Sequence, residues 1–282
     1  MFLGKEIRLK RLLNKKSGRL LAITMDHPIT RGVLPGIGDI KSVMKQVVAG
    51  EPDAITMHKG IIEKVYPPYV ASDVSIIMKA TSYSIPYHEA YDTPVADVEE
   101  AIRLGADAIS VGCIMGGPEQ AQQLTFLGQV SKAAASAGLP LVAHIYPKGP
   151  MIEDSFDAKN LAYCVRAGAE LGVDIIKTLW SGSPETFKSV VDSCPAMVAL
   201  AGGDMGNDLV SFLTNTRKAL DIGVGGVTYG RFVWQHENPT AVIKALNALI
   251  NDDCSVEQAI AEYKQAGENN PHSSRQCIGR KK

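Results

Sequence analysis

The segment DAKNLAYCVRAGAELGVDIIKTLW, residues 157–180, contains the unit that decides the fold of this chain. Residues 157–171 have a helical pattern, and residues 174–180 form a short apolar run that is typical of a buried strand. Gly172-Val173-Asp174 joins the two, because a glycine there can take the left-handed conformation that ends a helix. Gly105-Ala106-Asp107 repeats this junction before another apolar run. The segment therefore predicts a helix that leads directly into a strand.

Eight apolar runs of this kind follow one another along the chain. They are LLAITMD (20–26), AITMH (54–58), SIIMKAT (75–81), AISVGC (108–113), LVAHIY (141–146), DIIKTLW (174–180), MVALAGG (197–203) and GGVTYG (225–230). Helical patterns lie between them at 39–49, 98–104, 119–137, 157–171, 184–191, 207–220 and 240–250. Eight strands alternating with helices at about 30-residue spacing predict an α/β chain folded as a closed (β/α)8 (TIM) barrel.

The barrel is expected to form a single domain over residues 1–266. Ile7, Leu9, Leu12 and Leu13 are at helical spacing, and they predict an extra N-terminal helix packed against the barrel or a partner subunit. Residues 267–282 are polar, basic and poor in apolar side chains, so we expect a disordered tail there.

Composition excludes several classes of protein. With 29 Lys and Arg against 30 Asp and Glu, the chain lacks the surplus of cations that a general nucleic-acid binder needs. No apolar run approaches the roughly 20 residues that span a bilayer, and charges at positions 5, 6, 8, 10 and 11 interrupt any signal-peptide core. The 5 cysteines are odd in number and widely spaced. They predict reduced thiols in a cytoplasmic protein.

Side-chain alternation within the runs locates the barrel interior. Ile23 and Met25 share one face of the first run, and Thr24 and Asp26 share the other. Large apolar side chains should meet the helices, so the small or polar set should point inward. The last inward residue of each run then stands at the C-terminal mouth, where barrel enzymes build their active sites.

Lys177 is the most informative residue in the chain. It shares the inward face of its run with Ile175, and an unpaired buried ammonium is costly. Lys177 is therefore either salt-bridged inside the barrel or an amine of lowered pKa that attacks a ketone and forms a Schiff base. Lys79, in the run 75–81, is the alternative lysine for this role.

Two further residues end strands at the same rim. Tyr146 shares a face with His144, and a phenol at the mouth can carry a proton to or from substrate. Asp26 can orient the amine and move protons as a carbinolamine breaks down. Alone, Tyr146 would be read as a rim side chain and Asp26 as a loop carboxylate. Their convergence with Lys177 favours catalysis.

The ends of the last two runs are rich in glycine, and Arg231 follows the last one. Barrels often bind phosphate at these two loops, and an arginine adds a forked, charged donor. His27, His58 and His144 with Asp26 leave a zinc site open as an alternative, although no short ligand spacing supports it.

Five segments carry a resemblance to a known family. They are GRLLAITMDHPITRG (18–32), IYPKGP (145–150), GAELGVDIIKTLWSG (168–182), VALAGGD (198–204) and GGVTYGR (225–231). They resemble the archaeal-type class I aldolases, which include fructose-bisphosphate aldolases and the transaldolase-like 2-amino-3,7-dideoxy-D-threo-hept-6-ulosonate synthases. The resemblance covers about residues 5–250, and the opening segment looks closer to the heptulosonate synthases.

The resemblance implies roles for particular residues. Lys177 would form the Schiff base, Tyr146 would donate and accept protons, and Asp26 would assist the imine chemistry. The residues expected to bind substrate, including its phosphate, are His27, His144, Lys148, Gly202, Gly203, Gly230 and Arg231. The family is commonly a homo-oligomer, often a decameric ring, and needs no metal or organic cofactor.

The expected function is a metal-independent aldolase or transaldolase that cleaves or forms a C–C bond of a phosphorylated keto sugar. Two departures leave the substrate open: Pro28 stands where the family usually has glycine, and Asp204 stands where it usually has proline. Three alternatives remain. They are a thiolase-type relative acting on a phosphorylated signalling ketone, a zinc-dependent aldolase, and a non-catalytic barrel that binds a phosphorylated metabolite.

Overall fold

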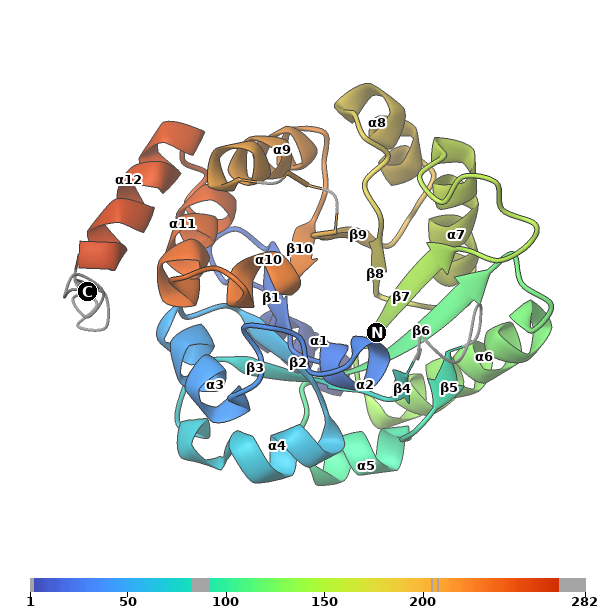
Figure 1. Ribbon diagram of the computed structural model, residues 1–282. Coiled ribbons are helices and arrows are strands. Elements are labelled where there is room, and N and C mark those ends of the chain that lie inside the picture. Colours follow the sequence, from blue (N-terminus) through green and yellow to red (C-terminus); the bar gives the residue numbers. More distant parts are fainter. Residues whose placement is uncertain (1–2, 83–91, 204, 207, 269–282) are drawn as a thin grey trace, which may run out of the picture.

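Eight parallel strands close into a barrel in the computed structural model, which describes residues 3–82, 92–203, 205–206 and 208–268 (Figure 1). The strands are β1 (Leu20–Thr24), β2 (Ala54–His58), β3 (Ser75–Lys79), β6 (Ala108–Met115), β7 (Leu141–Pro147), β8 (Ile175–Thr178), β9 (Met197–Ala201) and β10 (Gly226–Tyr229). Their order around the barrel is β1-β10-β9-β8-β7-β6-β3-β2. The predicted (β/α)8 barrel is confirmed. A short antiparallel pair, β4 (Thr81–Ser82) and β5 (Thr93–Pro94), follows β3.

Helices surround the barrel on its outside (Figure 1). The seven helices predicted from the sequence are α3 (Ile40–Ala49), α5 (Val98–Arg103), α6 (Gln120–Ala137), α7 (Ala158–Glu170), α8 (Pro184–Asp192), α9 (Leu209–Asp221) and α11 (Pro239–Asn251). Most begin at a capping side chain. Asp157, for example, accepts hydrogen bonds from the amides of Lys159 and Asn160 at the start of α7.

Four described helices were not among those predicted between the strands. They are α2 (His27–Arg31), α4 (Lys59–Val65), α10 (Arg231–Trp234) and α12 (Val256–Glu268). A 3₁₀ turn, η1 (Pro67–Tyr69), follows α4. Pro28 lies in the first turn of α2, where a backbone N–H has no partner within the helix, so this departure from the family pattern fits the local backbone. The loop expected after Asp26 is thus a short helix.

The core has two layers, as strand alternation predicted. Ile23 and Met25 belong to the large cluster between strands and helices, whereas Ala22 and Ile175 belong to a smaller cluster inside the barrel. Inward side chains are small or polar toward the C-terminal ends of the strands. The interior is consequently packed at the N-terminal end and polar at the other.

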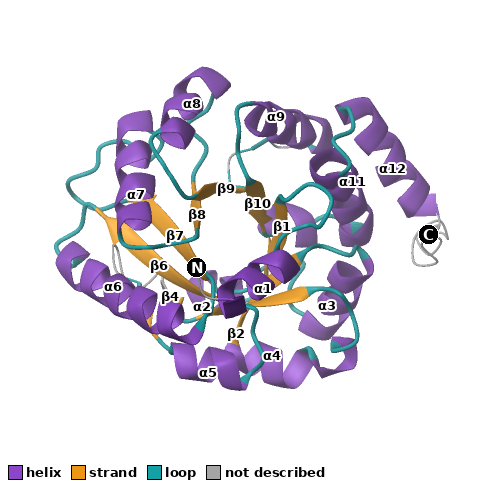
Figure 2. Cartoon of the chain, turned by 180° about the vertical axis from the view of Figure 1, so that it is seen from behind, coloured by secondary structure: helices purple, strands orange, loops and turns teal. Residues whose placement is uncertain are grey.

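Helix α1 (Leu3–Leu12) closes the N-terminal end of the barrel. Leu12 is fully buried and packs into the inner cluster. Lys5 Nζ lies 2.7 Å from an oxygen of Asp174, and Arg8 donates to the carbonyl of Gly138 at 2.9 Å. Figure 2, which views the molecule from behind, shows α1 across this end. The sequence prediction of a helix packed on the barrel is therefore confirmed.

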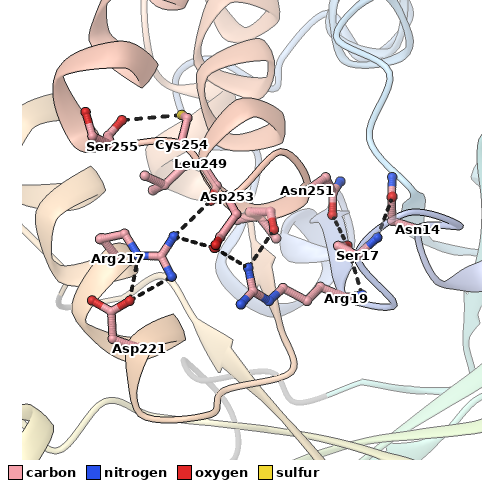
Figure 3. Close-up of polar contacts among 11 residues, drawn as sticks. Asn14, Ser17, Arg19, Arg217, Asp221, Leu249, Asn251, Asp253, Cys254 and Ser255 are labelled. Carbon is pink, nitrogen blue, oxygen red and sulfur yellow. Dashed lines mark hydrogen bonds and ion pairs between the residues drawn. The ribbon is translucent and has the colours of Figure 1, made fainter.

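A polar network joins the first and last parts of the barrel (Figure 3). Asp253, between α11 and α12, contacts Arg19 just before β1 at 3.0 Å and Arg217 of α9 at 2.9 Å. Arg217 also pairs with Asp221 at 2.8 Å. The network fixes the α11–α12 junction against the segment that enters β1.

Helix α12 extends to Glu268, two residues beyond the boundary predicted for the barrel domain. The rest of the predicted tail, residues 269–282, lies outside the described residues. Within the described part of the chain, no helix is both long enough and apolar enough to cross a membrane.

Candidate active site

A cavity opens at the C-terminal mouth of the barrel. All ten residues that the sequence and the resemblance nominated for catalysis or substrate binding line it. They are Asp26, His27, His144, Tyr146, Lys148, Lys177, Gly202, Gly203, Gly230 and Arg231. They come from the ends of β1, β7, β8, β9 and β10, so the barrel brings together residues that lie up to about 200 positions apart in the sequence.

Lys177 lies in β8 and is only 6% exposed. None of the ion pairs among the described residues includes it, so the salt-bridged interpretation finds no partner there. Burial lowers the pKa of Lys177 to about 8, against the attraction of Asp26, and the positive charges of Lys79 and Arg231 lower it further. An amine with this pKa is partly neutral at physiological pH and can act as a nucleophile.

Asp26 follows β1 and stands before the first turn of α2. Burial favours its neutral form, but His27 above all, and also Lys177, hold the pKa of the carboxyl well below its usual value. Asp26 Oδ1 lies 3.4 Å from Nδ1 of His27. The carboxylate is therefore ionised at neutral pH, and its charge stabilises any cation formed on Lys177.

The ring of His27 is held in place by β1 and α10. It packs edge-on against Trp234, with 5.3 Å between ring centroids, and the indole N–H donates to the carbonyl of Thr24 at 3.1 Å. Residue 230 must be a glycine, because His27 and Thr24 pack closely against its backbone. A Cβ at this position would lie 2.5 Å from both His27 Cε1 and Thr24 Oγ1.

Tyr146 and His144 point inward from β7, and the backbone of His144 is in register with that of Lys177. Burial raises the pKa of Tyr146, as do the negative charges of Asp26 and Asp92, so the phenol is protonated at neutral pH. Burial and the charges of Lys79 and Lys177 hold the pKa of His144 well below its usual value. His144 is therefore neutral. Its Nε2 is buried and has no hydrogen-bond partner among the described residues.

The cavity is rich in glycine at the ends of β9 and β10, and Arg31, Lys148 and Arg231 are among the cations that line it. Gly202 and Gly203 follow β9, and Arg231 begins α10 directly after Gly230. Burial lowers the pKa of Lys148, and the nearby charges of Arg31 and Arg231 lower it further, which places three cations near one another. Such a site can hold a phosphate. Asp204, the other departure from the family pattern, lies outside the described residues.

Several cavity residues were not predicted as site residues. Lys79 was considered only as a rival nucleophile, and Asp92 and Arg31 were not considered. Asp92 directly precedes β5, and Arg31 is the last residue of the unpredicted helix α2. Neither position lies on a predicted strand, so strand alternation could not have found them.

The histidines do not assemble a metal site. His58 ends β2 but does not line the cavity, unlike His27 and His144. Over the residues that the structure describes, no group of three or more His, Cys, Asp and Glu side chains is arranged to hold a metal ion. The ligand set of the zinc alternative is therefore not brought together.

Known proteins resemble this chain over most of its length. The DeoC/LacD family aldolase description matches residues 20–236. A 2-amino-3,7-dideoxy-D-threo-hept-6-ulosonate synthase of Halobacterium salinarum is 38% identical over 258 residues, which is 92% of this chain and 96% of the relative. A 2-amino-4,5-dihydroxy-6-oxo-7-(phosphonooxy)heptanoate synthase of Streptomyces griseus is 31% identical over 250 residues, 88% of this chain and 91% of the relative.

Solved structures of aldolases resemble this chain in fold. The crystal structure of an archaeal fructose 1,6-bisphosphate aldolase has a TM-score of 0.80 and 25% identity, and covers 88% of this chain and 99% of the other. A second structure, with the same TM-score, identity and coverage, is described as having its catalytic Lys covalently bound to the carbinolamine intermediate of the substrate. The predicted class of enzyme is confirmed, and the chain belongs to the DeoC/LacD family of aldolases.

Proposed function

We propose that this chain is a metal-independent class I aldolase or transaldolase that forms a Schiff base between Lys177 and a phosphorylated ketose. The observation that carries the proposal is a buried lysine of lowered pKa, without an ion-pair partner among the described residues, in a cavity that also holds Asp26 and Tyr146. Binding alone has no need of such a nucleophile, which argues against a non-catalytic barrel.

In the first half of the reaction, the neutral amine of Lys177 attacks the ketone carbon and forms a carbinolamine. Loss of water then gives an iminium ion on Lys177. Asp26, ionised and close by, stabilises that cation and can accept and return protons as the water departs. The iminium is the electron sink that the next step requires.

In the second half, the bond between the α and β carbons breaks as the β-hydroxyl loses its proton. An aldehyde leaves, and the electron pair of the broken bond forms an enamine on Lys177. Tyr146 is the candidate proton carrier, because the new positive charge of the iminium offsets the cost of charging its buried phenol. The enamine is then reprotonated and hydrolysed, or it attacks a second aldehyde, as a transaldolase would do.

The substrate class follows from the cavity and from the names of the relatives. The three cations that line the cavity with Gly202 and Gly203 suit the phosphate of the ketose donor. The Streptomyces griseus relative is named for a 2-amino-heptanoate with a 6-oxo group and a 7-phosphonooxy group. Cleaving the bond between carbons 4 and 5 of that product gives dihydroxyacetone phosphate and an α-amino acid aldehyde. We infer substrates of this kind for the present chain.

We further infer a homo-oligomer in the cytoplasm, from the family resemblance and the cysteines. Cys113, Cys164, Cys194 and Cys254 form no disulfide among the described residues, and Cys277 lies outside them. Reduced thiols fit a reducing compartment.

Borohydride trapping with dihydroxyacetone phosphate tests the proposal. Intact mass and peptide mapping should find the reduced adduct on Lys177, and dialysis against a chelator should leave its yield unchanged. Lys177→Met should abolish both the adduct and turnover, whereas Lys188→Met, an exposed lysine on α8, should change neither.

An adduct on Lys79 would make that residue the nucleophile. Loss of activity without a metal would restore the zinc alternative. If saturable binding occurs with neither an adduct nor exchange of the donor's α-proton, the chain is a non-catalytic binder. A thiolase-type reaction would be recognised by turnover that requires a thiol acceptor in place of an aldehyde.

A further inference from the structure

The wall of the cavity opposite the phosphate side carries one acidic and one basic side chain to which the mechanism assigns no step. In the closed barrel, β6 is the fourth strand from β10 in either direction, and β3 is the fourth from β9 (Figure 1). The walls formed by β9–β10 and by β3–β6 therefore face each other. Lys177, on β8, lies between them. A ketose whose phosphate lies at β9–β10 and whose carbonyl meets Lys177 must extend its other end toward β3–β6.

Asp92 occupies that far wall. It is 7% exposed and lines the cavity, and its backbone N–H donates to Oε1 of Gln123 at 3.3 Å. The carboxylate lies directly over Gly112 of β6, and a Cβ on that glycine would overlap it. Oδ1 is buried and has no hydrogen-bond partner among the described residues. A buried carboxylate oxygen without a donor is costly, so the site is built for a donor that arrives with a ligand.

Lys79 is the last residue of β3, the strand that pairs with β6. It is 4% exposed and also lines the cavity, and its backbone pairs with that of Ser110, two residues before Gly112 on β6. Within the described part of the chain, no ion pair includes Lys79 or Asp92, so the two charges do not neutralise each other within 4.0 Å. An acid and a base that share a wall without pairing are suited to two opposite charges on one ligand.

We propose that Asp92 and Lys79 recognise the ammonium and carboxylate of an α-amino acid aldehyde that serves as the acceptor in the aldol reaction. The inference rests on the proposed function and assigns its specificity to this wall. Asp92 also fixes the direction of the substrate, because its charge repels a phosphate dianion from the wall where Lys79 alone would attract one. The donor phosphate is thereby confined to the opposite side.

Three acceptor aldehydes distinguish the contact of Asp92 with the ammonium from the contact of Lys79 with the carboxylate. Aspartate 4-semialdehyde carries both charged groups, succinic semialdehyde lacks the ammonium, and 3-aminopropanal lacks the carboxylate. With dihydroxyacetone phosphate as donor, wild-type protein should prefer the first acceptor to each of the others by about 30-fold or more in kcat/KM, because each analogue leaves a buried charge unpaired.

Substitution of Asp92 or of Lys79 should each weaken only one of these two acceptor preferences. Asp92→Asn should reduce the preference over succinic semialdehyde to within about fivefold and retain the preference over 3-aminopropanal. Lys79→Met should reduce the preference over 3-aminopropanal to within about fivefold and retain the preference over succinic semialdehyde. Gly112→Ala, which displaces the carboxylate without removing it, should behave like Asp92→Asn. Each preference compares two acceptors on one protein, so a changed rate of imine formation cancels from the ratio.

Borohydride trapping of the donor on Lys177 in each variant shows that the variant folds and separates this inference from the proposed function. If trapping persists but Asp92→Asn and Lys79→Met leave both preferences unchanged, the assignment of this wall is wrong and the aldolase mechanism stands. If the wild-type protein forms no imine, the proposed function fails and this inference fails with it.

Discussion

At the residue scale, the proposed chemistry depends on one amine, that of Lys177, whose charged form is disfavoured by burial. Lys177 is removed from water, attracted by Asp26 and repelled by Lys79 and Arg231, and the balance brings its pKa to about 8. The charged neighbours come from different strands, so this balance belongs to the folded barrel rather than to the segment around Lys177.

The rate of imine formation should follow the neutral fraction of Lys177. With a pKa of about 8, that fraction rises from roughly a tenth at pH 7 to roughly nine-tenths at pH 9, so the trapping rate should rise about tenfold and then level off. Lys79→Met removes a repelling cation and should move the midpoint to higher pH. A rate that still rises steeply beyond pH 10 would indicate an ordinary lysine and contradict the assignment.

The role proposed for Tyr146 in proton transfer can be tested separately from the role proposed for Lys177 by removing the phenol oxygen of Tyr146. Tyr146→Phe should lower kcat for C–C cleavage by about 10²–10⁴-fold, because general acid–base catalysis contributes on that scale, while the borohydride adduct still forms. Single-turnover cleavage and trapping should be measured on the same preparation. Undiminished cleavage would assign the proton transfer to another group, and loss of the adduct as well would indicate a role in shaping the cavity.

At the scale of elements, each strand performs two functions along its length. Its N-terminal inward residues fill the barrel, and its C-terminal inward residues form the cavity. Helix α1 completes the filled end, where Leu12 contacts the inner cluster. Stability and chemistry are thus separated along the barrel axis.

This separation can be tested on α1. Leu12→Ala should lower the free energy of unfolding by about 2–5 kcal/mol, as for other buried leucines, and leave kcat/KM at 25 °C unchanged. Leu3→Ala, at a position on the same helix that is 71% exposed, should change the stability by no more than about 0.5 kcal/mol. Urea unfolding measures both variants. Equal effects would mean that α1 does not close the barrel as described.

At the scale of the whole molecule, the barrel must keep its last helices joined to its first strand. Asp253 makes this connection through Arg19 and Arg217, in a backbone conformation with a positive φ of 57°. Asparagine tolerates that conformation, so a substitution there can remove the charge without straining the chain.

Asp253→Asn should lower Tm by about 1–3 °C at low ionic strength, and by less in about 1 M salt, because exposed charges are screened. Asp192→Asn, which removes a single exposed pair with Lys188 on α8, should have a smaller effect. Borohydride trapping should be unaffected, because the network lies away from the cavity. A shift that does not depend on salt would contradict an electrostatic role for Asp253.

The sequence by itself determined the eight strands, the face of each that points inward, and the convergence of Asp26, Tyr146 and Lys177 at one mouth. These features follow from local rules, since alternation along a strand sets its faces and parallel strands end at the same edge of a barrel.

Only the tertiary structure decided which charges meet there. Lys177 lacks an ion-pair partner among the described residues, and Asp92 lies over Gly112, because strand register and the pairing of β4 with β5 place these side chains. The physical reason is that contacts between residues distant in the chain leave no periodic trace in the sequence.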